Sequence, residues 1–278
     1  MSGGTNDRAI IIGAEKSLIG IMTQPVPAPS GEHPAIVILN TGIIYRIGHN
    51  RMYVALARTL AEAGYTVLRF DMSGIGDSDN RHERLAPLEA NLTDIRHAID
   101  WLTMTLGVRR VILVGLCSGA DHAILFAGSD CRVGGVVLVD PNLTTNNPSY
   151  LRHVMRRRAW TNLLTGKGHL WWLLRRRFLQ SIEITGGDKV LGWQNPISNS
   201  QLLHAFEECA KLGIQMLAIF TGGSKNAYTV LIKIAKRKAN ERLTRLEYFS
   251  QCDHTFTFEE DRTRLSHVML EWIRQAGF

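Results

Sequence analysis

The sequence has few cysteines and no closely spaced pair of them. Four cysteines occur in 278 residues, and none of them forms a C-x-x-C pair. In a reducing compartment this spacing argues against a disulfide framework, and it lacks the usual pattern of a zinc site, so neither a metal nor a cofactor is predicted. We expect Cys131, Cys209 and Cys252 to be small buried apolar side chains. Cys117 has a different setting.

The sequence also lacks a long hydrophobic run. No apolar stretch approaches the roughly 18–20 residues that a membrane span requires. The first residues, MSGGTNDR, are polar and do not resemble a secretory signal, so a cytoplasmic location is expected. With 45% hydrophobic and 21% charged residues, the chain has the balance of a globular protein with a well-buried core.

Acidic residues are outnumbered, and the imbalance is local. The formal net charge is +7, and residues 152–189 hold nine Lys or Arg against two acids, Glu183 and Asp188. Such charge suits a nucleic acid, a membrane surface or an anionic substrate. No recognised nucleic-acid-binding motif accompanies it, so no nucleic-acid partner is predicted.

Short apolar runs alternate with segments of helical periodicity along most of the chain. This alternation predicts an α/β fold with a mostly parallel central sheet and helices on both faces, opened by an antiparallel pair. Strands are expected at 10–13, 18–25, 35–40, 65–71, 111–116, 136–141, 214–220 and 246–250, and helices at 52–64, 87–106, 123–128, 226–240 and 259–275.

One stretch, 142–212, breaks this rhythm. It lies between two expected strands, holds the arginine triplets as well as Trp160, Trp171 and Trp172, and is too long for a simple crossover. We interpret it as a helical cap inserted over the carboxyl edge of the sheet, where open α/β sheets place their sites. The core is then formed by residues 1–141 and 213–278.

The strongest chemical signal is VILVGLCSGADHA at 111–123, where Gly115 and Gly119 flank Cys117 by two residues on either side. This is a strand, a G-x-nucleophile-x-G turn and a helix, the context of a nucleophile elbow. Glycines are needed because side chains at the flanks of so tight a turn would collide. A thiol near an imidazole and a helix N-terminus ionises readily, and the thiolate attacks carbonyl carbons. The alternative is a glycine-flanked core cysteine.

Residues that follow the later strands are candidates for the base and the acid that would act with Cys117. His254, in CDHTF between the last strand and the last helix, is the candidate general base. The segment 219–228 after the expected seventh strand has no Asp or Glu, so the acid is Asp140, which ends the sixth strand, or an amide, Asn226, takes its place. A third alternative is that neither residue acts on His254.

The loop LNTGII at 39–44 follows the first buried strand. Its glycine favours a role in an oxyanion hole, for which the main-chain N–H groups of Ile43 and Ser118 are nominated. Farther along this loop, Arg46 and His49 are candidates to hold a polar substrate group at the pocket mouth, with exposed loop polarity as the alternative.

These motifs, together with RFDMSGIGDS at 69–78, resemble the α/β-hydrolase superfamily over nearly the whole chain outside 142–212. The likeness is to serine-aminopeptidase-like and exopolysaccharide-associated hydrolases, and the cysteine in the elbow is similar to that of dienelactone hydrolase. In this fold Asp71 and the Gly74-x-Gly76-x-Ser78 turn look structural. The histidine that often precedes the oxyanion glycine is replaced here by Thr41.

The pattern as a whole indicates acyl transfer. Cys117 would attack an ester or thioester of a small-molecule acyl substrate, and the acyl-cysteine would pass to water or to another acceptor. The basic segment suits an acyl group carried on coenzyme A or a carrier protein, unless its charge is only a solvated helix face. The alternative from another class is a catalytically silent binding protein with a hydrolase-like fold.

Overall fold

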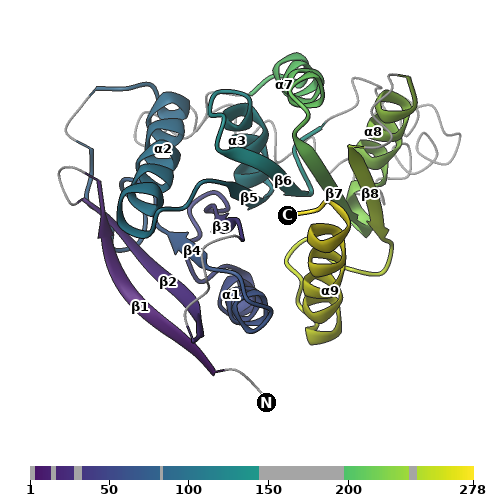
Figure 1. Cartoon of the computed structure of the whole chain (residues 1–278). Helices are drawn as coiled ribbons and strands as arrows, with labels where there is room; N and C mark the ends of the chain where they lie inside the picture. Colours follow the sequence, from purple (N-terminus) through teal and green to yellow (C-terminus); the bar gives the residue numbers. More distant parts are fainter. Residues whose placement is uncertain (1–3, 14–16, 28–32, 82–83, 144–196, 238–242) are drawn as a thin grey trace, which may run out of the picture. The chain divides into compact units, whose positions relative to one another are not determined.

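The computed structural model describes residues 4–13, 17–27, 33–81, 84–143, 197–237 and 243–278. The chain divides into two compact units, of which the first comprises 1–144 and 197–278 and the second 145–196. The second unit lies outside the described residues. The architecture below is that of the first unit, drawn in colour in Figure 1.

An eight-stranded sheet forms the centre of the first unit. Its strand order is β1-β2-β4-β3-β5-β6-β7-β8, with β1–β2 and β2–β4 antiparallel and all later pairings parallel. The predicted α/β-hydrolase fold, with its opening antiparallel pair, is therefore confirmed. The strands are β1 (Gly4–Ile12), β2 (Leu18–Val26), β3 (Ala35–Ile38), β4 (Val67–Phe70), β5 (Val111–Leu116), β6 (Val133–Val139), β7 (Gln215–Thr221) and β8 (Thr244–Phe249).

Helices cover both faces of the sheet, as Figure 1 shows. They are α1 (Met52–Glu62), α2 (Pro87–Leu106), α3 (Ser118–Ala127), α7 (Asn199–Lys211), α8 (Lys225–Arg237) and α9 (Glu259–Gln275), with single 3-10 turns η1 (His49–Arg51) and η2 (Gly222–Ser224). Helices α1 and α9 bury one face, and α2, α3, α7 and α8 bury the other.

The alternation of side chains along each strand divides the interior into two cores. In β5, Ile112 and Val114 pack in the core under α1 and α9, whereas Val111 and Leu113 pack in the core under α2 and α3. Every residue of β5 is buried because helices cover both faces of the sheet. A parallel strand in this position needs an apolar side chain at nearly every residue, as the sequence of β5 has.

The predicted insertion is too long at its carboxyl end. Helix α7 lies within the predicted 142–212 cap, yet it packs on α3 and buries Leu202, Phe206 and Cys209 in the core of the first unit. A capping box between Ser198 and Gln201 starts this helix. It is therefore part of the crossover from β6 to β7, and the remainder of the predicted cap, 144–196, lies outside the described residues.

Candidate active site

Cys117 occupies a strained turn between β5 and α3. Its backbone angles are φ 55° and ψ −120°, a conformation that residues other than glycine rarely adopt. The turn closes because both flanking positions lack a side chain. A Cβ at Gly115 would lie 2.1 Å from the carbonyl carbon of Gly119, and one at Gly119 would lie 2.5 Å from the oxygen of Asn40. The elbow thus presents the sulfur at the carboxyl edge of the sheet.

The structure brings Cys117, His254 and Asp140 together from three different loops. His254 lies between β8 and α9, and its Nδ1 is 2.7 Å from Oδ2 of Asp140. The His254 side chain also interacts with the thiol of Cys117, which lowers the pKa of the thiol and raises that of the imidazole. A continuous chain of contacts therefore runs from the sulfur through the imidazole to a buried carboxylate.

The electrostatics of this chain favour separated charges on the sulfur and the imidazole. The hydrogen bond from His254 lowers the pKa of the Cys117 thiol, against an opposing effect of burial. The hydrogen bond to Asp140, followed by that to Cys117, raises the pKa of His254 to about 10. An imidazolium that persists to such pH can hold a thiolate next to it at neutral pH.

Asp140 is held by hydrogen bonds from Thr221, at the end of β7, the strand after which an acid is usually expected. It follows β6 with φ 45°, and its carboxylate accepts hydrogen bonds from the main-chain N–H of Thr221 at 2.8 Å and from Thr221 Oγ1 at 2.6 Å. Burial raises the Asp140 pKa, but hydrogen bonds from His254, Thr221 and Ser224 outweigh it, and the net shift is downward. The segment after β7 therefore supplies donors rather than a carboxylate. Asn226 lies in α8, and its side chain is outside the described residues.

The predicted oxyanion loop is a tight turn next to the elbow. The N–H of Ile44 donates to the Thr41 oxygen at 2.9 Å, and the N–H of Gly42 donates to Oγ of Ser118 at 2.7 Å. The Ser118 N–H contributes to lowering the pKa of the Cys117 thiol. The side chain of Ile43 is 68% exposed, and within the described part of the chain its N–H makes no hydrogen bond. The two nominated N–H groups thus lie on loops that the Ser118 hydroxyl joins.

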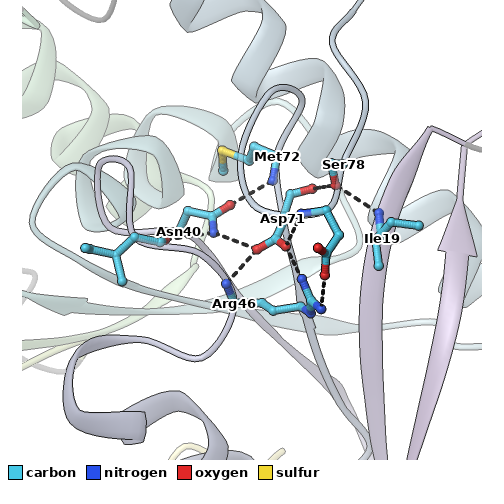
Figure 2. Close-up of polar contacts among 8 residues, drawn as sticks. Ile19, Asn40, Arg46, Asp71, Met72 and Ser78 are labelled. Carbon is cyan, nitrogen blue, oxygen red and sulfur yellow. Dashed lines mark hydrogen bonds and ion pairs between the residues drawn. The ribbon is translucent and has the colours of Figure 1, made fainter.

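Asp71 is hydrogen-bonded to residues at both ends of this loop, Asn40 and Arg46 (Figure 2). It is fully buried and accepts hydrogen bonds from the Asn40 side chain and from the main-chain N–H of Arg46, while its main-chain oxygen accepts one from Ser78. Asn40 in turn donates to the oxygen of Ile44 at 3.0 Å. This arrangement agrees with the structural role expected of Asp71 and its turn.

Arg46 belongs to this buried network, and the prediction that it holds a substrate group is wrong for this structure. Its guanidinium forms ion pairs with Asp71 and Asp77, and its side chain is only 15% exposed (Figure 2). The physical reason is that the Asp71 carboxylate is buried. It would be an unpaired buried charge without the Arg46 guanidinium.

His49, the other residue predicted to hold a substrate group, lies near His254. It lies in η1, is half-buried, and has its pKa lowered by burial and then by the nearby charge of His254. The adjacent Asn50 donates to the main-chain oxygen of Thr255 at 3.3 Å, which links this turn to the His254 loop. His49 thus borders the imidazole edge of the candidate site.

Three residues around the elbow, Asn142, Asp121 and Tyr53, had no signal in the sequence. Asn142, just after β6, has both side-chain amide atoms 3.6 Å from Cys117 Sγ, and it is bound to Asp121 of α3. A third, Tyr53 of α1, is buried behind the elbow with its OH 2.6 Å from Thr41 Oγ1, and burial raises its pKa to about 12. Thr41 therefore anchors the loop just before Gly42.

The other cysteines differ from Cys117 in their surroundings. Cys209 and Cys252 are buried as predicted, and burial raises the pKa of each to about 12. Cys131 is exposed, contrary to the prediction. Among the described residues no group of three or more His, Cys, Asp or Glu side chains could hold a metal ion. No helix in the same residues is long and apolar enough to cross a membrane.

This sheet order, with an elbow after β5 and a histidine after β8, defines an α/β hydrolase. The chain belongs to the family described as serine aminopeptidase, S33, whose model matches residues 31–213, more than half of its length.

One curated protein is similar over part of the chain, and solved structures share the fold. An uncharacterized 31.7 kDa protein of the traX-finO intergenic region of Escherichia coli is 30% identical over 118 residues, 42% of this chain and 40% of that protein. The chain thus matches less than half the length of this relative. Dienelactone hydrolase from Anabaena variabilis has a TM-score of 0.60 at 14% identity and covers 98% of both chains. XC6422 from Xanthomonas campestris, an α/β serine hydrolase without a lid, has a TM-score of 0.59 at 13% identity, over 97% of this chain and 94% of its own.

Proposed function

We propose that this α/β hydrolase uses Cys117 as a nucleophile to cleave esters or thioesters through an acyl-cysteine intermediate. The observation that carries the proposal is the chain of contacts from Cys117 through His254 to Asp140 at a nucleophile elbow. The serine hydrolases among its structural neighbours share the fold, and here a thiol stands at the position of the nucleophile.

In the first half-reaction the Cys117 thiolate forms a carbon–sulfur bond with the acyl carbon. The oxygen of the tetrahedral intermediate accepts hydrogen bonds from the N–H groups of Ile43 and Ser118. His254, charged at the outset, gives its proton to the leaving alcohol or thiol as the bond to the acyl carbon breaks. The products are the acyl-cysteine and a neutral imidazole.

In the second half-reaction the neutral His254 takes a proton from water, and the resulting hydroxide attacks the acyl carbon. The carbon–sulfur bond breaks, the acid leaves, and the thiolate and imidazolium are restored. Asp140 keeps Nδ1 of His254 protonated, so that Nε2 faces the sulfur throughout. An acceptor alcohol, amine or thiol in place of water makes the same chemistry an acyl transfer.

The experiment is intact-protein mass spectrometry after brief incubation with p-nitrophenyl esters and acyl-coenzyme A thioesters of several chain lengths. We expect a mass increase of one acyl group, located by peptide mapping on Cys117, and its loss in Cys117→Ala. Peptide hydrolysis is the alternative that the family description favours, and aminoacyl p-nitroanilides test it. An acyl group retained in Cys117→Ala, or turnover of any of these substrates by that variant, would contradict the proposal.

A further inference from the structure

A polar pair beside Cys117, Asn142 with Asp121, is not used by the proposed triad. Asn142 Nδ2 lies 2.6 Å from Oδ2 of Asp121, and the main-chain N–H of Asn142 donates to Oδ1 of the same carboxylate at 2.9 Å. Asp121 is 2% exposed and lies in the first turn of α3. Asn142, a surface residue, is therefore held by both oxygens of a buried acid, one of which accepts from its side chain and the other from its main chain.

This contact determines which way the Asn142 amide faces. A carboxylate only accepts hydrogen bonds, so the NH2 group and not the oxygen of Asn142 must face Asp121. Nδ2 has a second hydrogen, and Cys117 Sγ lies 3.6 Å from Nδ2, within the range of an N–H···S contact. The neutral thiol has an acceptor as well, because Oδ1 of Asn142 is also 3.6 Å from Sγ.

We propose that Asn142 stabilises the thiolate of Cys117 by donating a hydrogen bond to the sulfur, and that Asp121 is the positioning residue that orients its amide. This inference rests on the proposed role of Cys117 as a nucleophile. It adds to His254 a second side-chain donor on the sulfur, one that carries no charge and does not leave when His254 gives up its proton. The thiolate expelled from the acyl-enzyme thus has a partner at the moment when it forms.

Several charged or titratable groups also face this part of the site. His254 contacts the sulfur directly, and Asp140 and His49 act on it through His254. Tyr53 lies close enough for a thiolate to raise the pKa of its phenol, which stays neutral below about pH 12. The negative charge of Asp121, like that of Asp140, opposes a thiolate. Its burial raises the Asp121 pKa, and the hydrogen bonds from Asn142 act against that rise.

The test is the pH dependence of the iodoacetamide alkylation rate at Cys117, measured by peptide mapping in the full chain. Asn142→Ala should move the acid limb of the profile upward by roughly one pH unit, the scale of a hydrogen bond to a charged group. Asn142→Asp should move it at least as far, because it brings a negative charge to the sulfur. The matched control is Asn91→Ala, since the Asn91 amide contacts His122 of α3 and makes no contact with Cys117 in the structure.

Asp121→Asn separates orientation from direct charge. If Asp121 acts through Asn142, this variant should raise the thiol pKa, because an amide at 121 lets the Asn142 amide turn over. The same change in the Asn142→Ala background should then have no upward effect. A lowered thiol pKa in Asp121→Asn would show direct repulsion only and would overturn the positioning role. Thermal melts establish that each variant is folded, and Asn142→Ser replaces the alanine variant if the latter is not.

The wild-type profile separates failure of this inference from failure of the proposed function. If the acid limb of wild-type Cys117 already lies at the pH of an ordinary free thiol, the nucleophile assignment fails. If the wild-type limb is lowered but Asn142→Ala, or its serine substitute, leaves it unchanged, the triad stands and the role of Asn142 is wrong.

Discussion

Asp140, at the end of β6, and His254, after β8, are joined by a 2.7 Å hydrogen bond although 114 residues separate them in the chain. Strand β7 lies between β6 and β8 in the sheet, and Thr221 at its end donates to Asp140 from its main chain and its hydroxyl. The carboxylate is thereby fixed on one oxygen by Thr221 N–H and on the other by Thr221 Oγ1 and His254. A carboxylate held in this way can orient an imidazole from a strand end that is not the usual one.

Asp140→Asn should lower kcat by about two to four orders of magnitude. The upper limit is the effect of the equivalent change in serine enzymes, and a pre-formed thiolate makes the penalty milder here. The change should also bring the pKa of His254 down from about 10, because the hydrogen bond to the carboxylate is the largest cause of its elevation. Steady-state kinetics and an NMR titration of His254 measure both effects.

The control for that variant is Asn226→Ala, which should cost far less activity. If the two variants act in the reverse order, the amide orients His254 and the proposed acid is wrong. If neither matters, Cys117 and His254 act as a dyad.

Cys117→Ser should remain folded and lose most of its activity. A hydroxyl has to surrender its proton to His254 during attack, whereas the thiol pKa is already lowered by the same residue. Rates of ester hydrolysis and the melting temperature of both proteins check this. A serine variant as active as the wild type would mean that the cysteine is a tolerated substitute rather than a chemical requirement.

Ser118→Ala should lower kcat by roughly tenfold with little change in KM, since an oxyanion contact acts mainly in the transition state. The variant keeps the Ser118 N–H but removes the hydroxyl that accepts from Gly42 at 2.7 Å, so the loop carrying Ile43 loses its tie to the elbow. Ser118→Thr, which retains a hydroxyl, is the matched control. Equal activity of the alanine and threonine variants would show that the Ser118 hydroxyl does not contribute to catalysis.

Arg46→Ala should destabilise the protein rather than weaken substrate binding selectively. It leaves the fully buried Asp71 without its cation, and breaking such a pair costs about 3 kcal/mol. Asp77→Ala breaks the outer pair of the same arginine, but Asp77 is 66% exposed, so that loss should stay below about 1 kcal/mol. Urea unfolding compares the two. A stable Arg46→Ala with a raised KM would restore the role in substrate binding.

Sequence patterns predicted those features of the fold that depend on local composition. Strands covered on both faces have continuous apolar runs, so 111–116 was predicted with the bounds that β5 has, and α2 was predicted over the same 87–106 span. Strand β1 begins at Gly4, well before the predicted residue 10, because pairing with β2 holds its polar first half and Asp7 bonds to Thr23 there.

The site residues that the sequence missed depend on long-range contacts. Arg46 meets Asp71 across 25 residues and Asn142 meets Asp121 across 21, and neither pairing has a periodic or motif signature. Asp140 was found only because it ends a strand next to the one where an acid was missing. A turn former before Pro141 would have the same sequence, and only the position of His254 distinguishes the two.

The central claim is that Cys117 is a thiolate nucleophile, and the most direct measurement is competitive labelling of all four cysteines with limiting iodoacetamide at pH 6, read by peptide mapping. The account predicts that Cys117 is labelled far ahead of the exposed Cys131, and that Cys209 and Cys252, whose pKa values burial raises to about 12, stay unlabelled. His254→Ala should abolish this preference. Labelling of Cys131 as fast as Cys117 in the folded wild-type protein would contradict the claim.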